Sequence, residues 1–224
     1  MQTWKSFLNL FLQSNCPLCK RPASQEFCEY CEKQLQKCRL TSPNQRKDNS
    51  LQIIAWGAYG GAIKRAITTM KYDNHPEIAR PLGEWLGEAW LQEYGNENSF
   101  IVVPIPMHPD KQKKRGFNQA ALIAKSFCQT TGLKLKLNGL KRVKETEALF
   151  GLSSTERKQN LNQAFDIGKD FRQPPNVPVI LVDDIYTTGA TVKSAIETLS
   201  KYEIIVSGVA AVAVPSKGNY KNNS

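Results

Sequence analysis

The segment 179–191 limits the possible folds of this chain more than any other stretch of the sequence. A hydrophobic run ends in two adjacent acids, Asp183 and Asp184, and a short loop of hydroxyl-bearing and small residues then leads into a helical pattern. Ligands of open α/β sheets bind at the carboxyl ends of strands, and the free N–H groups of a helix N-terminus attract anions. This order of elements predicts an α/β fold with an anion site at a strand-to-helix turn.

The loop after the acids supplies groups that a phosphorylated sugar needs. Its threonine hydroxyls add hydrogen-bond donors, and Gly189 lets the backbone approach a phosphate closely. The acids lie where they could hold sugar hydroxyls or a divalent cation, and a carboxylate at the exposed end of a strand is not expected to support the core. A strand, turn and helix without a ligand is the alternative, which the complete order of residues disfavours. The predicted ligand-binding residues are Asp183, Asp184, Thr187, Thr188, Gly189, Ala190 and Thr191.

Strand and helix patterns alternate along the rest of the chain. Apolar runs bounded by turn residues predict strands, and apolar positions at helical spacing predict helices. The strands are expected at 51–59, 100–105, 133–140, 177–183 and 204–214, and the helices at 62–70, 76–94, 117–130 and 190–201. Two charged stretches, 108–115 and 141–157, are expected to be loops. The alternation predicts a mostly parallel sheet flanked by helices.

Two C-x-x-C pairs stand near the N-terminus. Cys16 and Cys19 form the first, and Cys28 and Cys31 form the second, with eight residues between the pairs. This spacing lets two turns present four thiolates to one tetrahedral zinc ion. Four sulfur ligands leave no open coordination position, so the zinc would be structural. Cys38 is an alternative ligand.

Two other uses of these cysteines compete with zinc. Disulfides need an oxidising compartment, and nothing in the sequence suggests secretion. A redox C-x-x-C needs a thioredoxin-like context and does not ordinarily occur twice. Cys128 lies within a helical apolar face, where a core role is expected. Zinc is therefore the favoured interpretation of the paired spacing.

A polar stretch without periodicity, 38–50, predicts a linker. We therefore expect a zinc module at 1–48 and a second domain at 49–224. The apolar positions within 4–12 favour an amphipathic helix over a signal sequence, because polar residues interrupt them and no cleavage site follows.

The net charge of +10 favours anionic partners, although charge alone names none. No run of eighteen apolar residues exists, which excludes a transmembrane helix at the sequence level and predicts a cytoplasmic protein without membrane insertion.

Together these residues resemble a known family. The segment 179–191 is similar to the phosphoribosyl pyrophosphate (PRPP) motif of type I phosphoribosyltransferases, in which the acids hold the ribose hydroxyls and the loop holds the 5-phosphate. The cysteine pairs, the stretch 103–106 and the block Arg115-Gly-Phe-Asn-Gln-Ala narrow the resemblance to the ComF family of competence-associated proteins, also called ComFC or GntX. Arg157, Asn160 and 164–165 extend it over nearly the whole chain.

The resemblance implies further site residues. Arg115, at the end of the loop 106–115, would contact the diphosphate, and the loop 141–157 would close over the site. Arg142 and Lys144 would neutralise a leaving pyrophosphate, which makes these three cations the catalytic candidates. For any single lysine, Lys71 included, a solvated surface position is the simpler interpretation. Leu149 departs from the glutamine that the family often has there.

The resemblance leaves two functions open. One is a protein that binds PRPP or a similar phosphorylated ligand and takes part in DNA uptake and transformation, with single-stranded DNA and a motor protein as partners. The other is an active phosphoribosyltransferase, which would use PRPP with magnesium and a nitrogen acceptor that the sequence does not identify. Competition between PRPP and DNA for the protein would separate the two.

Overall fold

The structure is a computed structural model, and it describes residues 14–48, 51–95, 99–144 and 164–216. The strands are β1 (Ser14–Asn15), β2 (Pro22–Ala23), β3 (Asn44–Asp48), β4 (Leu51–Tyr59), β5 (Ile101–Pro104), β6 (Lys134–Leu135), β7 (Leu140–Arg142), β8 (Phe165–Ile167), β9 (Val179–Ile185) and β10 (Val206–Pro215). The helices are α2 (Glu29–Gln36), α3 (Gly61–Tyr72), the 3-10 turn η1 (Pro76–Ile78), α4 (Ala79–Tyr94), α5 (Pro109–Arg115), α6 (Gln119–Thr131) and α8 (Ala190–Ser200).

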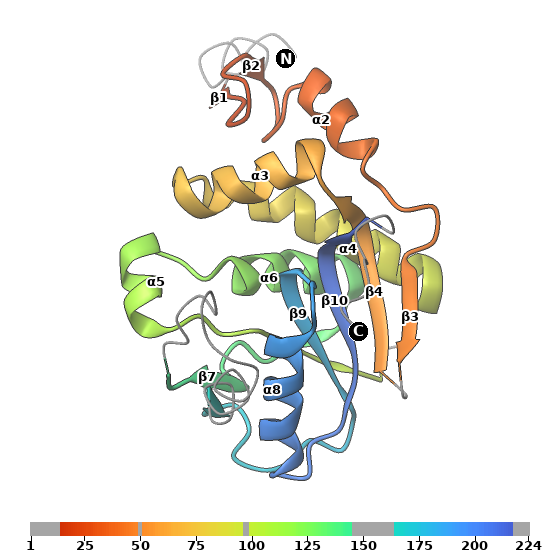
Figure 1. Cartoon of the computed structure of the whole chain (residues 1–224), viewed down its shortest axis with the longest axis vertical. Helices are drawn as coiled ribbons and strands as arrows, with labels where there is room; N and C mark the ends of the chain where they lie inside the picture. Colours follow the sequence, from red (N-terminus) through yellow and green to blue (C-terminus); the bar gives the residue numbers. More distant parts are fainter. Residues whose placement is uncertain (1–13, 49–50, 96–98, 145–163, 217–224) are drawn as a thin grey trace, which may run out of the picture.

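A six-stranded sheet forms the centre of the molecule, in the order β3-β4-β10-β9-β5-β6. Strands β4, β10, β9, β5 and β6 run parallel to one another, and β3 is antiparallel to β4. Figure 1 shows α3, α4 and α6 together on one face of this sheet and α8 on the other. The predicted fold class, a mostly parallel sheet flanked by helices with a small cysteine module, is confirmed.

Alternate residues of the central strands fill two separate cores. On β9, Ile180 and Val182 pack with α3, α4 and α6, while Val179 and Leu181 pack with α8 and the small β7-β8 sheet. This period of two is what a strand covered on both faces requires. On the first face α4 and α6 approach closely, and a Cβ at Gly83 would lie 2.5 Å from the carbonyl oxygen of Ile123.

The cysteine module, residues 14–36, shares the first of these cores. Buried Cys16, Phe27 and Leu35 belong to the same apolar cluster as the residues of α3 and α4. The ring of Trp85 on α4 stacks with Phe27 at 6.0 Å and with Trp56 of β4 at 4.9 Å between centroids. In Figure 1 the module sits beside α3 at one end of the molecule. The module is thus packed onto the sheet domain rather than tethered to it.

Three segments differ from the sequence-based expectation. The polar stretch 38–50 is not a simple linker, because β3 pairs with β4 at the edge of the sheet. The expected strand 133–140 is divided into β6 and β7 by a turn that ends at Gly139. The domain boundary between residues 48 and 49 stays a prediction.

The third segment is the charged stretch 108–115, which holds the helix α5 instead of a loop. His108 accepts a hydrogen bond from the N–H of Asp110 at 3.3 Å, Pro109 occupies the first turn, and Gly116 ends the helix with a φ of 86°. Each of these is a helix-boundary signal.

Among the described residues, no helix has the length and apolar character that crossing a membrane would require.

Candidate functional site

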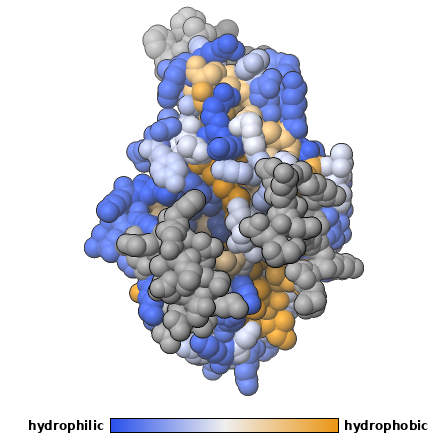
Figure 2. Space-filling model, viewed as in Figure 1, coloured by the Kyte–Doolittle hydropathy of each residue, from blue (hydrophilic) through white to orange (hydrophobic). Residues whose placement is uncertain are grey.

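A cavity of about 400 Å³ opens at the carboxyl ends of the parallel strands. Residues from the ends of β4, β5, β7 and β9, from α3 and α5, and from the first turns of α6 and α8 line it. They are Tyr59, Lys71, Tyr72, Ile105, Pro106, Met107, Lys111, Arg115, Asn118, Gln119, Arg142, Asp183, Asp184, Ile185, Thr187 and Thr191. In Figure 2 the surface over α5, which lies at the left, is strongly hydrophilic. The cavity is a polar site at the edge of the sheet where α/β proteins bind ligands.

Asp184 lies on the floor of this cavity and is almost completely buried, with 3% of its surface exposed. Its Oδ2 forms an ion pair with Nζ of Lys71, and its Oδ1 accepts a hydrogen bond of 3.1 Å from Nε2 of Gln119. The expectation that this acid stands at an exposed strand end is therefore wrong. Lys71 from the last turn of α3 and Gln119 from the start of α6 contact its two oxygens and enclose it.

Asp183 also lines the cavity and keeps partial exposure. Its Oδ1 accepts a hydrogen bond of 2.8 Å from the N–H of Asp184. Burial of the carboxyl group, and then the charge of Asp184 next to it, raise the pKa of Asp183 well above its usual value. The two acids thus differ, since one is held in an ion pair while the other resists ionisation.

A chain of polar contacts extends from Asp184 toward α5. Gln119, which donates to Asp184, accepts a hydrogen bond of 2.6 Å from Arg115 through its Oε1. The guanidinium of Arg115 also lies over the ring of Tyr72, 5.5 Å from its centroid. These contacts fix the position of Arg115 at the cavity wall.

The loop 186–189 ends at the N-terminus of α8. Gly189 has a φ of +74°, and a Cβ there would lie 2.5 Å from the hydroxyl of Tyr186. No side chain of α8's N-cap satisfies the first turn, although Oγ1 of Thr188 accepts a long bond of 3.5 Å from the N–H of Ala190. Thr187 and Thr191 line the cavity, whereas Thr188, Gly189 and Ala190 shape the turn. The N–H groups in the first turn of a helix are a site that could hold an anion.

The other two cations expected at the site lie on and after β7. Arg142 lines the cavity, with its guanidinium 5.4 Å from the centre of the Phe165 ring. Lys144 is exposed and is not among the lining residues; its carbonyl oxygen accepts a bond of 3.4 Å from Nε of Arg142. The remainder of the expected closing loop, from residue 145 and including Leu149 and Arg157, lies outside the described residues.

Sequence reasoning did not assign Lys71 and Gln119 to the site. Gln119 stood within the block used for the family resemblance, which was a usable signal. Lys71 carried no signal beyond its place at the end of a helical pattern. Its role depends on the meeting of α3 and β9, which are distant in the sequence.

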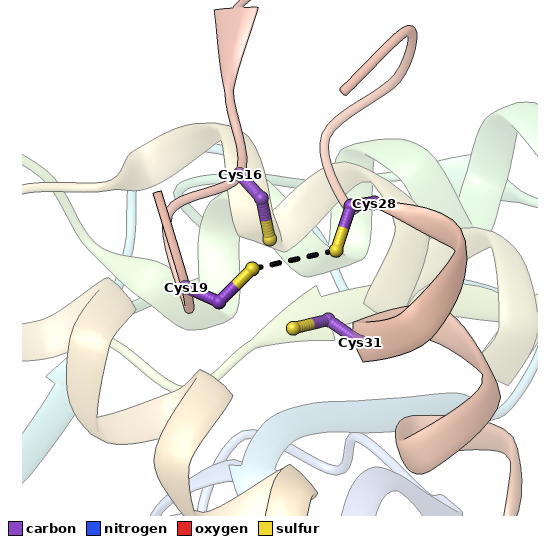
Figure 3. Close-up of side chains that lie close together, drawn as sticks. All are labelled: Cys16, Cys19, Cys28 and Cys31. Atoms are coloured by element: carbon purple, nitrogen blue, oxygen red, sulfur yellow. Dashed lines mark hydrogen bonds between the residues drawn. The ribbon is translucent and has the colours of Figure 1, made fainter. Parts of the chain in front are cut away.

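The four cysteines of the two C-x-x-C pairs form a second candidate site. Figure 3 shows their side chains pointing toward one another, with Cys16 and Cys19 in the segment between β1 and β2 and the other two at the start of α2. Their sulfur atoms all lie within 4.8 Å of one another, and the sulfurs of Cys19 and Cys28 are 3.4 Å apart. Tetrahedral zinc with Zn–S bonds of about 2.3 Å separates its ligands by roughly 3.8 Å, so the geometry fits a metal.

The surroundings of the cluster favour a thiolate at Cys16, whereas burial and the neighbouring thiols raise the pKa of Cys31. Burial would raise the pKa of Cys16, but hydrogen bonds from the backbone N–H groups of Cys28, Leu18 and Cys19 lower this pKa to about 7. Arg65 on α3 approaches the sulfur of Cys31 at 3.9 Å. Cys38 lies outside the cluster, because its sulfur faces the carbonyl oxygens of Gln34 and Gly60. Burial raises the pKa of Cys128 to about 12, and its partly buried thiol packs against the first core.

Curated relatives resemble this chain over most of its length. Competence protein F of Haemophilus influenzae is 30% identical over 90% of this chain and 93% of its own. Competence protein ComFC of Bacillus subtilis is 30% identical over 82% of this chain and 70% of its own. The DNA utilization protein YhgH of Salmonella typhimurium is 27% identical over 83% of this chain and 78% of its own.

Among solved structures, an adenine phosphoribosyltransferase resembles this chain with a TM-score of 0.42 and 19% identity, over 70% of this chain and 82% of that one. No family model matches the chain.

Proposed function

The chain belongs to the ComF family of competence-associated proteins, and from this premise we propose that its cavity binds PRPP or a closely related phosphorylated pentose. One observation carries the proposal: the acid pair at the end of β9 and the N-terminus of α8, whose N-cap Gly189 has no side chain, open into the same cavity. Such a cavity offers carboxylates to sugar hydroxyls and N–H groups to a phosphate.

The proposed binding mode gives each part of the cavity a chemical role. The 5-phosphate would occupy the first turn of α8, with the hydroxyls of Thr187 and Thr191 as further donors. Asp183 and Asp184 would accept hydrogen bonds from the ribose hydroxyls. Arg115 and Arg142 would face the diphosphate, to which guanidinium groups bind in a bidentate manner.

Magnesium was expected with PRPP, yet the acid pair does not fit a resident cation well. Both carboxylate oxygens of Asp184 already have partners, Lys71 and Gln119, and burial disfavours the ionised form of Asp183. A magnesium site needs ionised oxygens with room for near-octahedral geometry. We therefore assign no step to a metal held by these acids.

We propose that the four-cysteine cluster holds one structural zinc ion. The four sulfur donors support this, because zinc prefers such a closed tetrahedral set and a fully sulfur-bound metal cannot activate water. Cys16, Cys19, Cys28 and Cys31 would be its ligands.

A role in DNA uptake is proposed from the relatives, which are named for competence and DNA utilization. The cationic helix α5, with Lys113 and Lys114 exposed beside the cavity, supports contact with single-stranded DNA. A DNA-uptake motor is the proposed protein partner, and the cytoplasm is the proposed location.

DNA affinity should fall steeply as salt rises, because binding releases condensed counterions. A salt-independent interaction, or none at low salt, would refute direct DNA binding.

Catalysis is the second candidate function, and the presence of Arg115 and Arg142 in the cavity wall favours it. A nitrogen nucleophile would attack C1 of PRPP, the new C–N bond would form, and the C–O bond to pyrophosphate would break with both electrons leaving on oxygen. The two guanidinium groups would stabilise the negative charge that develops on the leaving group. Release of pyrophosphate during incubation with candidate acceptors would distinguish an enzyme from a binding protein.

Isothermal titration calorimetry with PRPP and ribose 5-phosphate tests the proposed pocket. Both should bind at one site per chain, and binding of one should exclude the other. DNA added to the same titration shows whether the nucleic acid competes. Failure of both sugars to bind the folded wild-type protein would refute the proposal.

A further inference from the structure

Lys71 stands out among the cations of the cavity, because its ammonium group forms an ion pair with the more buried of the two acids. It occupies the last turn of α3, and its Nζ meets Oδ2 of Asp184. The side chains of Lys71 and Asp184 are 18% and 5% exposed. An ion pair so enclosed is screened far less than a surface pair.

The opposite side of Asp184 is also occupied. Nε2 of Gln119 donates to Oδ1, and Arg115 holds the other end of the same amide by donating to Oε1. Oδ2 lies against the ammonium group of Lys71, so side chains of the protein contact both oxygens of Asp184. A divalent cation at Oδ2 of Asp184 would have to displace Lys71.

The second acid, Asp183, offers little negative charge to a divalent cation. One oxygen of Asp183 accepts the N–H of Asp184, and burial favours the neutral form of the carboxyl group. Of the described residues that line the cavity, four are cationic, namely Lys71, Lys111, Arg115 and Arg142, and two are acidic. The protein therefore supplies positive charge where a phosphorylated sugar would need it.

We propose that Lys71 is a built-in counter-ion of Asp184 that takes the place of a divalent cation, so that the cavity binds a phosphorylated pentose in its metal-free form. A lysine ammonium is a compact point charge with three donors, which suits this substitution. The inference rests on the proposed function, because it specifies the ionic form of the ligand.

The test uses calorimetry with ribose 5-phosphate, whose single phosphate binds magnesium less strongly than a diphosphate does. Buffers are freed of metals with a chelating resin rather than with a soluble chelator, so that metal in the cysteine cluster is retained, and zinc content is measured before each titration. For wild-type protein, added magnesium should change the affinity by less than about twofold, since no metal is needed at the acid pair.

Lys71→Gln removes the counter-ion and should expose Asp184 to the ligand as an uncompensated charge. Its affinity should be about tenfold weaker without metal and should recover in part with magnesium. Lys71→Arg keeps the charge and should stay independent of magnesium. Lys64→Gln, on an exposed position of the same helix, is the matched control and should behave like wild type.

The outcomes separate this inference from the proposed function. Wild-type protein that loses affinity tenfold or more without magnesium overturns the inference alone, as does a folded Lys71→Gln variant with unchanged, metal-independent affinity. Wild-type protein that binds neither ribose 5-phosphate nor PRPP under any condition overturns the proposed function and this inference with it. If Lys71→Gln does not fold, the wild-type titrations and Lys71→Arg still decide.

Discussion

The two candidate sites are built in opposite ways. The cysteine cluster draws all its donors from one short stretch, 16–31, and its four sulfurs face one another, with the guanidinium of Arg65 3.9 Å from the sulfur of Cys31. The cavity collects its charged groups from helices and strands far apart in the chain, and its most buried acid is already neutralised by Lys71. The zinc ion proposed for the first site would be supplied from outside the chain, while in the second site Lys71, a residue of the chain itself, neutralises the most buried acid.

The largest loss of stability is expected from replacing one cysteine of the four-cysteine cluster. Cys16→Ser should abolish most bound zinc, from an expected one ion per chain. It should also lower the free energy of unfolding by several kcal/mol, since metal binding at such sites is a large part of folding energy. Because Cys16 lies in the same core as α3 and α4, the whole chain should melt earlier, and not the module alone. Metal analysis and thermal unfolding measure both effects.

Cys38→Ser is the control for this change, because Cys38 is half-buried near the module but lies outside the cluster. It should retain zinc and melt close to wild type. Metal-free protein with an unchanged melting profile would contradict the dependence of this site on an ion.

A smaller loss of stability is expected from breaking the ion pair between Lys71 and Asp184 in the cavity. Asp184→Asn leaves the ammonium group of Lys71 without its partner in a mostly buried position, and should cost about 2 kcal/mol of stability. The same change should weaken sugar binding. Chemical denaturation and calorimetry measure the two losses.

Asp166→Asn provides the matched comparison, since Asp166 pairs with Lys141 at 2.9 Å in an exposed position. Exposed pairs contribute about 0–1 kcal/mol, so this variant should be nearly as stable as wild type. Equal stability of the two variants would mean that the Lys71–Asp184 pair does not support the fold.

The contrast between the sites also explains what the sequence could predict. Spacing alone identifies Cys16 and its three partners, because all four lie within reach of two local turns. The acids and threonines of 183–191 are equally local, and the alternation of apolar segments predicts the sheet. The contacts of Lys71 and Gln119 could not be predicted, since they depend on how α3 and α6 pack against β9. The helix α5 was missed although its capping residues were present, because its charge suggested a loop.

Replacing the other acid, Asp183, is expected to change stability in the opposite direction. The raised pKa of Asp183 means that the folded protein holds this proton more tightly than the unfolded chain does. The cost of ionising the carboxyl group therefore appears as the pH rises above the unfolded-state value of about 3.9. This cost stops increasing once the pH exceeds the pKa of Asp183 in the folded protein.

Asp183→Asn removes that cost, so the variant should be more stable than wild type at neutral pH. The difference should vanish as the pH falls below 4 or so. Thermal unfolding at a series of pH values measures it. A difference that is constant with pH, or that grows toward acid, would contradict this account of Asp183.

The smallest effect concerns the hydroxyls of the loop and distinguishes lining residues from turn residues. Thr187 lines the cavity, whereas the hydroxyl of Thr188 faces the N–H of Ala190 at the start of α8. Thr187→Val removes a donor while nearly keeping side-chain volume, and should weaken sugar binding by roughly fivefold, as the loss of one hydrogen bond does. Thr188→Val should also weaken binding, but by less, because it acts only through the start of the helix. Neither change should alter stability by more than about 0.5 kcal/mol, since both side chains are exposed. Calorimetry with ribose 5-phosphate ranks the two variants, and a larger loss for Thr188→Val would place the phosphate deeper in the turn than the lining residues indicate.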